Sequence, residues 1–406
     1  MSYTATAPQT TQRLAVVDAL RGFALMAIII LHSIEHYNCF YQPQWQPQWL
    51  NTLDSHVVDV LWFFFAGKAY ATFSLLFGFS FFIQMRNARQ RGHDFRLRFA
   101  WRMLLLALFA QLHALFYNGD ILLLYAFCGL ILIPASSLSN RALVIIALVL
   151  LLQPVDWAHI ITALCDPAYI DTNSRFAAYA AQAEQIAMHG DLWQTLADNI
   201  GNGQLYSNFW QVEAGRITQT PALFMLGMWL GRKHYFQHSL QSVMFWKRVI
   251  MAFVPLWVLF YVLNIVLPPI CDNVTWLSHI GIALNMPANF CFMAILVAGF
   301  VLLWFKSRDG WRCQRVAIAM GRMSLTNYIV QSILGVTLFY NFGLGLYRYC
   351  GSTLSFAVAL TVIVLLTLIS RAWLSRHRQG PLEWLWKRLT WIRDKHVHKY
   401  EKSSCR

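Results

Sequence analysis

Apolar runs that are long enough to cross a bilayer recur along the whole chain. A helix that spans about 30 Å of hydrocarbon needs about 20 residues, because each residue rises 1.5 Å. Ten segments come close to this length and are separated by polar stretches: 14–34, 57–84, 99–117, 119–135, 141–160, 216–232, 248–268, 279–305, 316–341 and 353–374. The pattern predicts an all-α, polytopic integral membrane protein with about ten transmembrane helices.

Shorter patterns complete the predicted organisation. A turn around Asn118-Gly119-Asp120 joins the third and fourth runs, so they form a hairpin. Residues 174–188 have helical apolar spacing and predict a surface helix, and residues 380–391 mix Trp, Leu and basic residues, as interfacial helices do. We expect a single membrane domain without repeats. It comprises N-terminal helices at 14–160, an outside loop at 157–215 and a C-terminal part at 216–406.

Composition and charge agree with this class and orient it. The 406 residues are 58% hydrophobic and 12% charged, with a mean hydropathy of +0.46, whereas soluble domains carry about 25% charged residues. This excludes a cytosolic globular enzyme, a disordered protein and a disulfide-stapled secreted scaffold. With the N-terminus inside, 28 of 32 Lys and Arg lie on or near the cytoplasmic side, and 12 of 18 Asp and Glu lie outside. The positive-inside rule therefore predicts cytoplasmic termini in a bacterial inner membrane.

The net charge of +14 would suggest a nucleic-acid partner if it were continuous. Instead it is divided among inner loops, chiefly 86–102 and 306–322, which face anionic headgroups. We expect membrane lipids and a small-molecule or glycan acceptor as partners, and no nucleic acid. Asp18 and Arg21 interrupt the first run, so no cleavable signal peptide is expected. The oligomeric state stays open.

The eight cysteines are divided by this topology. Cys39, Cys165, Cys271 and Cys350 face outside, Cys128 and Cys291 lie in helices, and Cys313 and Cys405 face the cytosol. The outside cysteines form up to two disulfides or, equally, remain unpaired near helix ends. The spacing of Cys and His matches no metal motif, so no metal is expected.

Ionisable residues inside the first span mark a candidate site, because they are costly in a membrane. Asp18 and Arg21 lie near its cytoplasmic end, and His32 follows Arg21 by eleven residues. That spacing is almost three helical turns, which puts Arg21 and His32 on one face about 16 Å apart. A cation near one leaflet and an imidazole near the other suit a reaction that spans the membrane. The structural alternative is that Arg21 snorkels and Asp18 pairs with the helix dipole.

Other polar groups in the spans point to the outer half of the protein. Lys68 lies in mid-span, where it needs a ligand or a counter-ion such as Asp59. His113 and Asp120 are spaced to form a pair in which the carboxylate orients a general base. The outer half also contains His32, His36 and His56.

The eighth run adds uncharged polar groups. Asn285 and Asn289 flank Pro287, and Asn264 lies in the run before. Proline removes a helical hydrogen bond, so a break at Pro287 is expected, and broken helices line cavities in transporters.

Seven segments together resemble a known family. They are Arg13 with residues 18–24 (DALRGFA), 67–68 (GK) with 73–78 (FSLLFG), His113, 119–126 (GDILLLYA), 226–232 (LGMWLGR), 321–328 (GRMSLTNY) and 380–386 (GPLEWLW). In these the chain resembles the bacterial YeiB-like membrane proteins, a domain of unknown function that is also loosely labelled as transport. The first helix is similar to heparan-alpha-glucosaminide N-acetyltransferases, which move acetyl from cytosolic acetyl-CoA to a sugar amine. It is also similar to acyltransferase-three proteins, which carry an Arg, ten residues and a His, as Arg21 and His32 do here.

The resemblance implies a transmembrane acyltransferase. It would move an acyl group from cytoplasmic acyl-CoA, the donor substrate, to a hydroxyl or amine at the periplasmic side. Arg21 and arginines of the 86–102 loop would meet the phosphates, His32 or His113 would act as base or acyl relay, and Lys68 would stabilise the oxyanion.

The candidate catalytic residues are therefore His32, His113, Asp120 and Lys68, and the candidate substrate-binding residues are Asp18, Arg21, Asp59, His56, Asn285 and Asn289. The alternative function is a transporter or exporter of a small solute. In that case Lys68, Asp59 and the histidines line a proton-coupled path.

Overall fold

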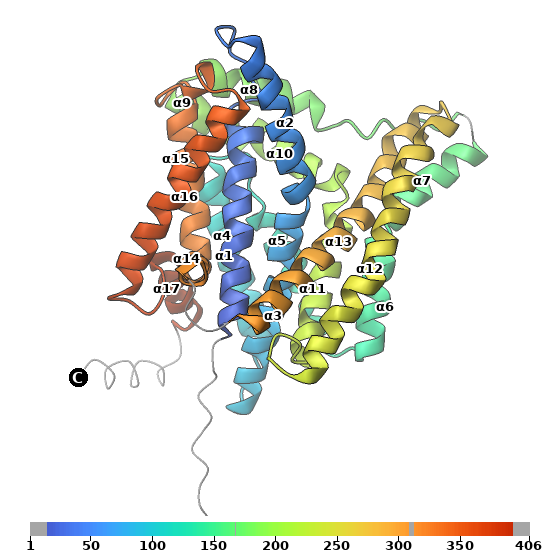
Figure 1. The fold of residues 1–406 in the computed structure, drawn as a ribbon, viewed down its shortest axis with the longest axis vertical. Helices are drawn as coiled ribbons and strands as arrows, with labels where there is room; N and C mark the ends of the chain where they lie inside the picture. Colours follow the sequence, from blue (N-terminus) through green and yellow to red (C-terminus); the bar gives the residue numbers. More distant parts are fainter. Residues whose placement is uncertain (1–13, 167, 308–311, 393–406) are drawn as a thin grey trace, which may run out of the picture.

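The chain folds into a helical bundle in the computed structural model, which describes residues 14–166, 168–307 and 312–392 (Figure 1). The described residues contain no strand. The helices are α1 (Ala15–His32), α2 (Gln48–Phe65), α3 (Lys68–Gln90), α4 (Arg96–Ala114), α5 (Leu122–Ala135), α6 (Asn140–Leu151), α7 (Pro154–Cys165), α8 (Ala177–His189), α9 (Leu192–Ile200), α10 (Asn202–Glu213), α11 (Arg216–Arg232), α12 (Leu240–Val266), α13 (Val274–Lys306), α14 (Arg312–Arg322), α15 (Ser324–Phe339), α16 (Ser352–Leu374) and α17 (Pro381–Thr390). A π-helix over Ser33–Tyr37 extends α1. The all-α prediction is confirmed.

All ten predicted runs are helical, but three of them are divided. The run 57–84 breaks between α2 and α3, 141–160 bends by 47° between α6 and α7, and 316–341 divides between α14 and α15. By length and composition, five of the described helical segments could cross a membrane, or six if α6 and α7 form one span. These apolar helices are those of a membrane protein.

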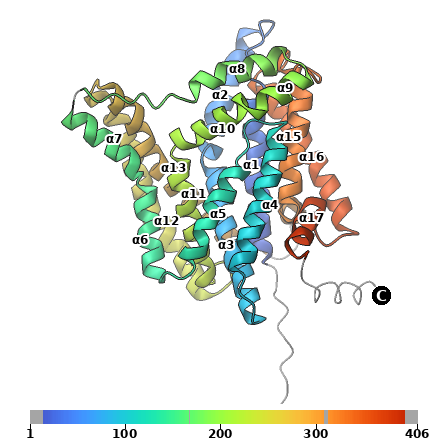
Figure 2. The same ribbon diagram turned by 180° about the vertical axis from the view of Figure 1, so that it is seen from behind.

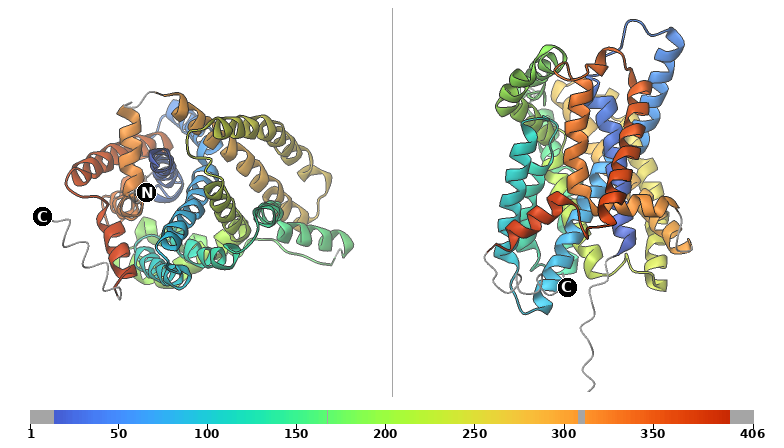
Figure 3. Two further views of the ribbon diagram at one scale, coloured as in Figure 1. Left: turned by 90° about the horizontal axis from the view of Figure 1, so that it is seen from below. Right: turned by 90° about the vertical axis from the view of Figure 1, so that its left-hand side faces the viewer.

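The helices form a bundle with an arm. Helix α1 lies inside the bundle, with α14, α15 and α16 on one side and α2 and α3 on the other (Figure 1). Helices α8, α9 and α10 lie over one end (Figure 2). Helices α6, α7, α12 and α13 form the arm, and α12 and α13 lean away from the helices around α1 (Figure 3). Helix α12 packs on α13, and few of its residues are fully buried, as expected for a helix with a face toward lipid.

Glycines set the closest helix contacts of the bundle. A Cβ added at Gly22 of α1 would overlap the carbonyl oxygen of Ala317 in α14, and one added at Gly321 would overlap that of Asp18. The same relation joins α3 to α11 through Gly78 and Gly227. Small residues let helix backbones approach closely and pack by van der Waals contact, which holds helices together where lipid surrounds them.

The expected break at Pro287 is wrong. Helix α13 runs without interruption from Val274 to Lys306 and contains Pro287. The break lies instead at Ala66–Gly67, where Gly67 has a φ of 74°. A left-handed residue stops a helix more effectively than a proline does, because packed neighbours can re-satisfy the single carbonyl that a proline frees.

The shorter predicted elements are present. Helices α4 and α5 form the hairpin, α8 occupies most of 174–188, and α17 occupies the Trp-rich tract. Helix α17 packs on α4 and α15, and its Glu383 accepts the backbone N–H groups of Leu325 and Thr326 at the start of α15. Arg13, Arg308 and Cys405, and the side chain of Cys313, lie outside the described residues.

Gly22→Ala should destabilise the protein, because the methyl group forces α1 and α14 apart. The matched control is Gly281→Ala in α13, where a Cβ meets nothing within 4 Å. The control should be neutral or stabilising by up to about 1 kcal/mol, since alanine favours a helix. Thermal unfolding of both variants in detergent measures the difference, and equal midpoints would contradict the packing argument.

Candidate functional site

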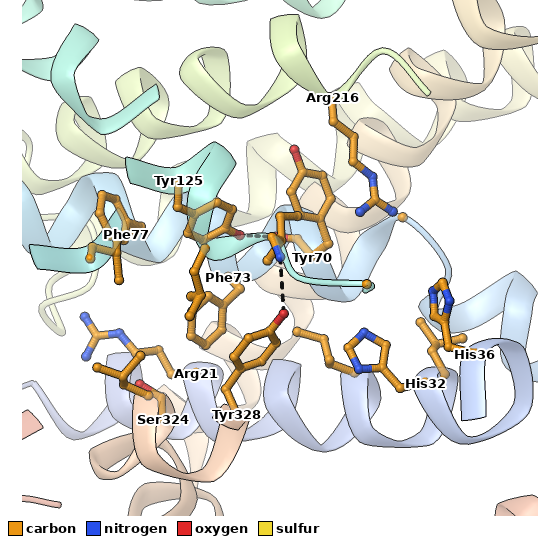
Figure 4. Close-up of a pocket in the computed structure, with 18 of the residues that line it drawn as sticks. Arg21, His32, His36, Tyr70, Phe73, Phe77, Tyr125, Arg216, Ser324 and Tyr328 are labelled. Atoms are coloured by element: carbon orange, nitrogen blue, oxygen red, sulfur yellow. Dashed lines mark hydrogen bonds between the residues drawn. The ribbon is translucent and has the colours of Figure 1, made fainter. Parts of the chain in front are cut away.

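A cavity of about 620 Å³ runs beside α1 (Figure 4). Its wall is made by α1 and its π-helix, the α2–α3 break, and residues of α3, α4, α5, α10, α11, α15 and α17. Arg21 lies at one end and His32 at the other, with aromatic rings between them (Figure 4). The predicted placement of these two residues on one face of a helix is therefore confirmed.

The Arg21 end of the cavity carries two guanidinium groups. Arg21 donates to the Asp18 carboxylate at 3.1 Å and also to the hydroxyl of Ser80 on α3. Arg102 of α4 stacks on the Trp386 ring at 3.9 Å and donates to Thr390 at 3.3 Å. Two cations on one wall favour an anionic group on the ligand, and a guanidinium suits phosphate in particular. Asp18 is buried behind Arg21 and fixes its position.

Aromatic side chains form the middle of the cavity. Phe73 and Phe77 come from α3, Tyr125 from α5 and Tyr328 from α15 (Figure 4). The Tyr125 hydroxyl bonds to Ser74 at 2.6 Å, and that of Tyr328 accepts from the backbone N–H of Ile121 at 3.4 Å. Because these hydroxyls already have partners, the middle of the cavity offers mainly apolar surface to a ligand.

His32 is held at the far end by two neighbours. Its Nδ1 lies 3.4 Å from the Tyr37 hydroxyl and 3.3 Å from the side-chain amide of Gln331, and Tyr37 itself donates to Gln331 at 2.9 Å. Within the described part of the chain, the other ring nitrogen, Nε2, has no hydrogen-bond partner. One nitrogen is thus oriented by protein and the other is left for a ligand, as in a general base.

Four more polar groups surround His32 that the sequence interpretation did not select as candidates. Glu35 and His36 reach the cavity from the π-helix, with 3.9 Å between the Glu35 carboxylate and Nε2 of His36. Arg216 enters from the start of α11 and stacks over the rings of Tyr70, at 4.6 Å, and Trp210, at 4.0 Å. The fourth group, the phenol of Tyr206, lies on α10.

Burial raises the pKa of Tyr206 above its ordinary value, and the nearby Glu35 carboxylate raises it further. The phenol is therefore protonated at neutral pH and can donate a hydrogen bond. Arg216 had left a signal in the sequence, because the predicted topology puts only three arginines outside, namely Arg175, Arg216 and Arg348.

The predicted His113–Asp120 pair is present. Nδ1 of His113 lies 2.7 Å from Oδ1 of Asp120, and both side chains are buried. The His113 ring lies 5.3 Å from the ring of Tyr328, and Tyr328, not His113, lines the cavity. Ser207 and Gln211 of α10 donate to the backbone carbonyl of Asp120. The pair therefore lies one layer behind the cavity wall and joins the α4–α5 turn to α10.

Lys68 lies beside the cavity but is not among its lining residues. It begins α3, and its ammonium donates to the carbonyl of Trp62 near the end of α2 at 3.5 Å, with the Phe292 ring at 5.7 Å. A cation at the carbonyl end of a helix is stabilising. No ion pair joins Lys68 to Asp59 among the described side chains. Asp59 and His56 are exposed on α2 and do not converge with the other candidates.

The candidate asparagines belong to the arm. Asn285 accepts from Asn264 at 3.3 Å, and Asn289 packs against Gly67, where an added Cβ would lie 2.9 Å from its amide nitrogen. Neither lines the cavity. Cys39, Cys165, Cys271 and Cys350 are free cysteines in the described part of the chain.

Comparison with known proteins finds a partial family match and three similar sequences. Residues 230–393 match the family described as "Protein of unknown function (DUF418)". YxaH, an uncharacterized protein of Bacillus subtilis, is 27% identical over 94% of this chain and 95% of its own length. YeiB of Escherichia coli, also uncharacterized, is 27% identical over 93% of this chain and 96% of its own.

The chain is thus similar to uncharacterized YeiB-like proteins over nearly its whole length, and residues 230–393 match the DUF418 family. An uncharacterized 39.9 kDa protein from the amylase 3′ region of Bacillus acidopullulyticus is 24% identical over 94% of this chain and 95% of its own. No solved structure matches the chain. The cavity is made largely by α1–α5, α10 and α11, so most of it precedes the DUF418 match, which begins at the end of α11.

Proposed function

We propose that this YeiB-like protein is a transmembrane acyltransferase with acyl-CoA as donor. The observation that carries the proposal is the single cavity beside α1, with Arg21 and Arg102 at one end and His32, Glu35 and Arg216 at the other. An acyl-CoA has the same order of properties: phosphates, a long neutral arm and a reactive thioester. The two arginines would hold phosphates, and the aromatic middle would cover the pantetheine arm.

The transfer step would take place beside His32. The acceptor hydroxyl or amine attacks the thioester carbonyl, the C–S bond breaks and a C–O or C–N bond forms. The acceptor proton passes to His32, and His32 then gives this proton to the departing sulfur, which leaves as the free thiol. Arg216 and the neutral phenol of Tyr206 line the same cavity and would donate to the developing oxyanion.

His113 and Lys68 receive other roles in this proposal. The His113–Asp120 pair would position Tyr328 and α10, since it lies behind the wall. Lys68 would hold the α2–α3 break, because its ammonium is bonded to the end of α2. Transport of a small solute through the same cavity is the competing function. One argument for it was a helix broken at Pro287, and α13 is not broken there.

We further propose that the ten helical runs span a bacterial inner membrane with both termini in the cytoplasm. The distribution of Lys and Arg supports this orientation. It places the Arg21 end of the cavity toward the cytosol, where acyl-CoA is found, and the His32 end toward the periplasm.

Arg21→Ala and Arg102→Gln should each weaken acyl-CoA binding about tenfold or more, because each removes a charge-assisted hydrogen bond to phosphate. Calorimetry on detergent-purified protein, from acetyl-CoA to long-chain acyl-CoAs, measures this. Arg96→Ala is the matched control, since Arg96 is exposed on the same helix as Arg102 and does not line the cavity. Arg102→Gln keeps the test valid if Arg21→Ala, which removes an ion pair of the buried Asp18, fails to fold. If the unaltered protein binds no acyl-CoA saturably, the proposal is wrong and solute flux in proteoliposomes becomes the next assay.

His32→Gln should leave expression and acyl-CoA binding intact while lowering acyl transfer about 10²- to 10⁴-fold, the usual contribution of a general base. Transfer is measured as radiolabel passing from acyl-CoA into acceptors of everted membrane vesicles. His56→Gln, on an exposed face of α2, should retain full transfer. Unchanged transfer in His32→Gln would remove His32 from the mechanism.

A membrane-impermeant maleimide should label Cys165 in intact cells, because this exposed thiol ends α7 on the proposed periplasmic side. The comparison is made in a cysteine-free background that keeps only Cys165 or carries only Arg91→Cys. Arg91 is exposed between α3 and α4, on the proposed cytoplasmic side. The cysteine of the Arg91→Cys variant should be labelled only after lysis. Labelling of this cysteine, and not of Cys165, in intact cells would show the inverted topology.

A further inference from the structure

Two histidines and two aspartates meet in the arm, away from the cavity. His159 comes from α7, His279 from α13 and Asp171 from the segment between α7 and α8, and Asp156 lies one turn before His159. One potential ligand atom from each of His159, Asp171 and His279 lies within 4.8 Å of the other two. None of these residues lines the cavity or belongs to the segments that resemble the family.

The two helices and the segment hold these side chains in place. The imidazole rings of His159 and His279 stack with centroids 4.5 Å apart and planes 3° from parallel. Asp171 lies 3.5 Å from His159 Nδ1, and its backbone N–H donates to Thr275 of α13 at 2.9 Å. Beneath them, a small apolar core joins α7 to α13, with Ile160, Ile280, Ala283 and Leu284 at its centre.

His279 has the pattern of a metal-binding imidazole. Its Nδ1 lies 2.8 Å from the buried carboxylate of Asp156. Its Nε2 is buried and has no hydrogen-bond partner in the described part of the chain, although the side chain is only 4% exposed. A buried nitrogen without a partner costs about 1–3 kcal/mol, so its persistence needs a reason. Metal-binding histidines regularly give one nitrogen to a carboxylate and the other to the ion.

We propose that His159, His279 and Asp171 bind a divalent transition-metal ion such as Zn²⁺, with Asp156 orienting His279. Two imidazoles and one carboxylate suit a borderline ion and leave a position for water. Ligand atoms on one tetrahedral ion lie about 3.4 Å apart, given metal–ligand distances near 2.1 Å. The three side chains would therefore draw together on binding. The partly exposed His159 would also turn out of its stack with His279, because two parallel imidazoles cannot both point an in-plane lone pair at one ion.

The ion would tie the segment before α8 to the arm. Asp171 is the ligand outside the helices, so binding would link α7 and α13 to the connection that leads over the bundle (Figures 1 and 2). The expectation of no metal rested on local spacing. Spacing cannot find this group, because its ligands are 12 and 108 residues apart in the chain. The proposal is independent of acyl transfer.

The test uses full-length protein purified in detergent through an affinity tag without histidines. Metal content is measured by mass spectrometry, and Zn²⁺ affinity by competition with a chromophoric chelator after chelator treatment. We expect one ion per chain. His279→Gln and Asp171→Asn should abolish stoichiometric binding, and Asp156→Asn should weaken it about 10- to 100-fold.

His189→Gln is the matched control, because His189 is exposed at the end of α8 and outside the group. It should bind one ion as the unaltered protein does. Size-exclusion profiles and thermal midpoints establish that each variant is folded. If His279→Gln does not fold, Asp171→Asn still tests the proposal, because Asp171 lies in a partly exposed segment. Zn²⁺ binding that is absent from the unaltered protein, or retained by both ligand variants, would overturn the proposal.

Discussion

Close contact between glycine-paired helices is the constraint on which the rest of the structure depends. Gly22 and Gly321 bring α1 against α14, and Gly78 and Gly227 bring α3 against α11. The hydrophobic effect does not drive helices together within lipid, because lipid tails are as apolar as the helix surfaces. Close van der Waals contacts such as these must therefore hold the bundle together. They also place the cavity, because α1 carries Arg21 and His32, α3 carries the aromatic wall and α11 begins with Arg216. All four glycines lie in the segments that resemble the family, which gives those motifs a packing explanation before any catalytic one.

Two departures from regular helix shape the wall between those contacts. The π-helix over Ser33–Tyr37 adds a residue to the turn after His32, so Glu35 and His36 reach the same cavity. The break at Ala66–Gly67 brings backbone to the wall from the opposite side. Irregular backbone is tolerated at membrane depth where it is buried or lines a cavity. π-Helical turns often occur at functional sites for the same reason.

Hydropathy predicted the elements well, because helix formation in a membrane follows from local sequence alone. The relation of Arg21 to His32 was equally predictable, since both lie on one helix with known geometry. Position along a helix axis, however, does not give rotation about it. His56, Asp59, Asn285 and Asn289 were selected as candidates from their positions along the helices, yet none of them lines the cavity. Arg216 was missed because the positive-inside rule uses arginines only to orient the chain, so an arginine on the outer side was not considered as a site residue.

The buried charges of the cavity support a ligand with two distinct ends. Each guanidinium is already partly compensated: Arg21 by Asp18, Arg102 by the Trp386 ring, and Arg216 by two aromatic faces. Aromatic faces offset only part of the cost of removing a cation from water, so Arg102 and Arg216 still favour an anion or a developing negative charge beside them. An acyl-CoA would supply the first at its phosphates and the second at its thioester during attack. A small solute, by contrast, would contact the charged groups at only one end of the cavity at a time and would leave the aromatic middle without a ligand.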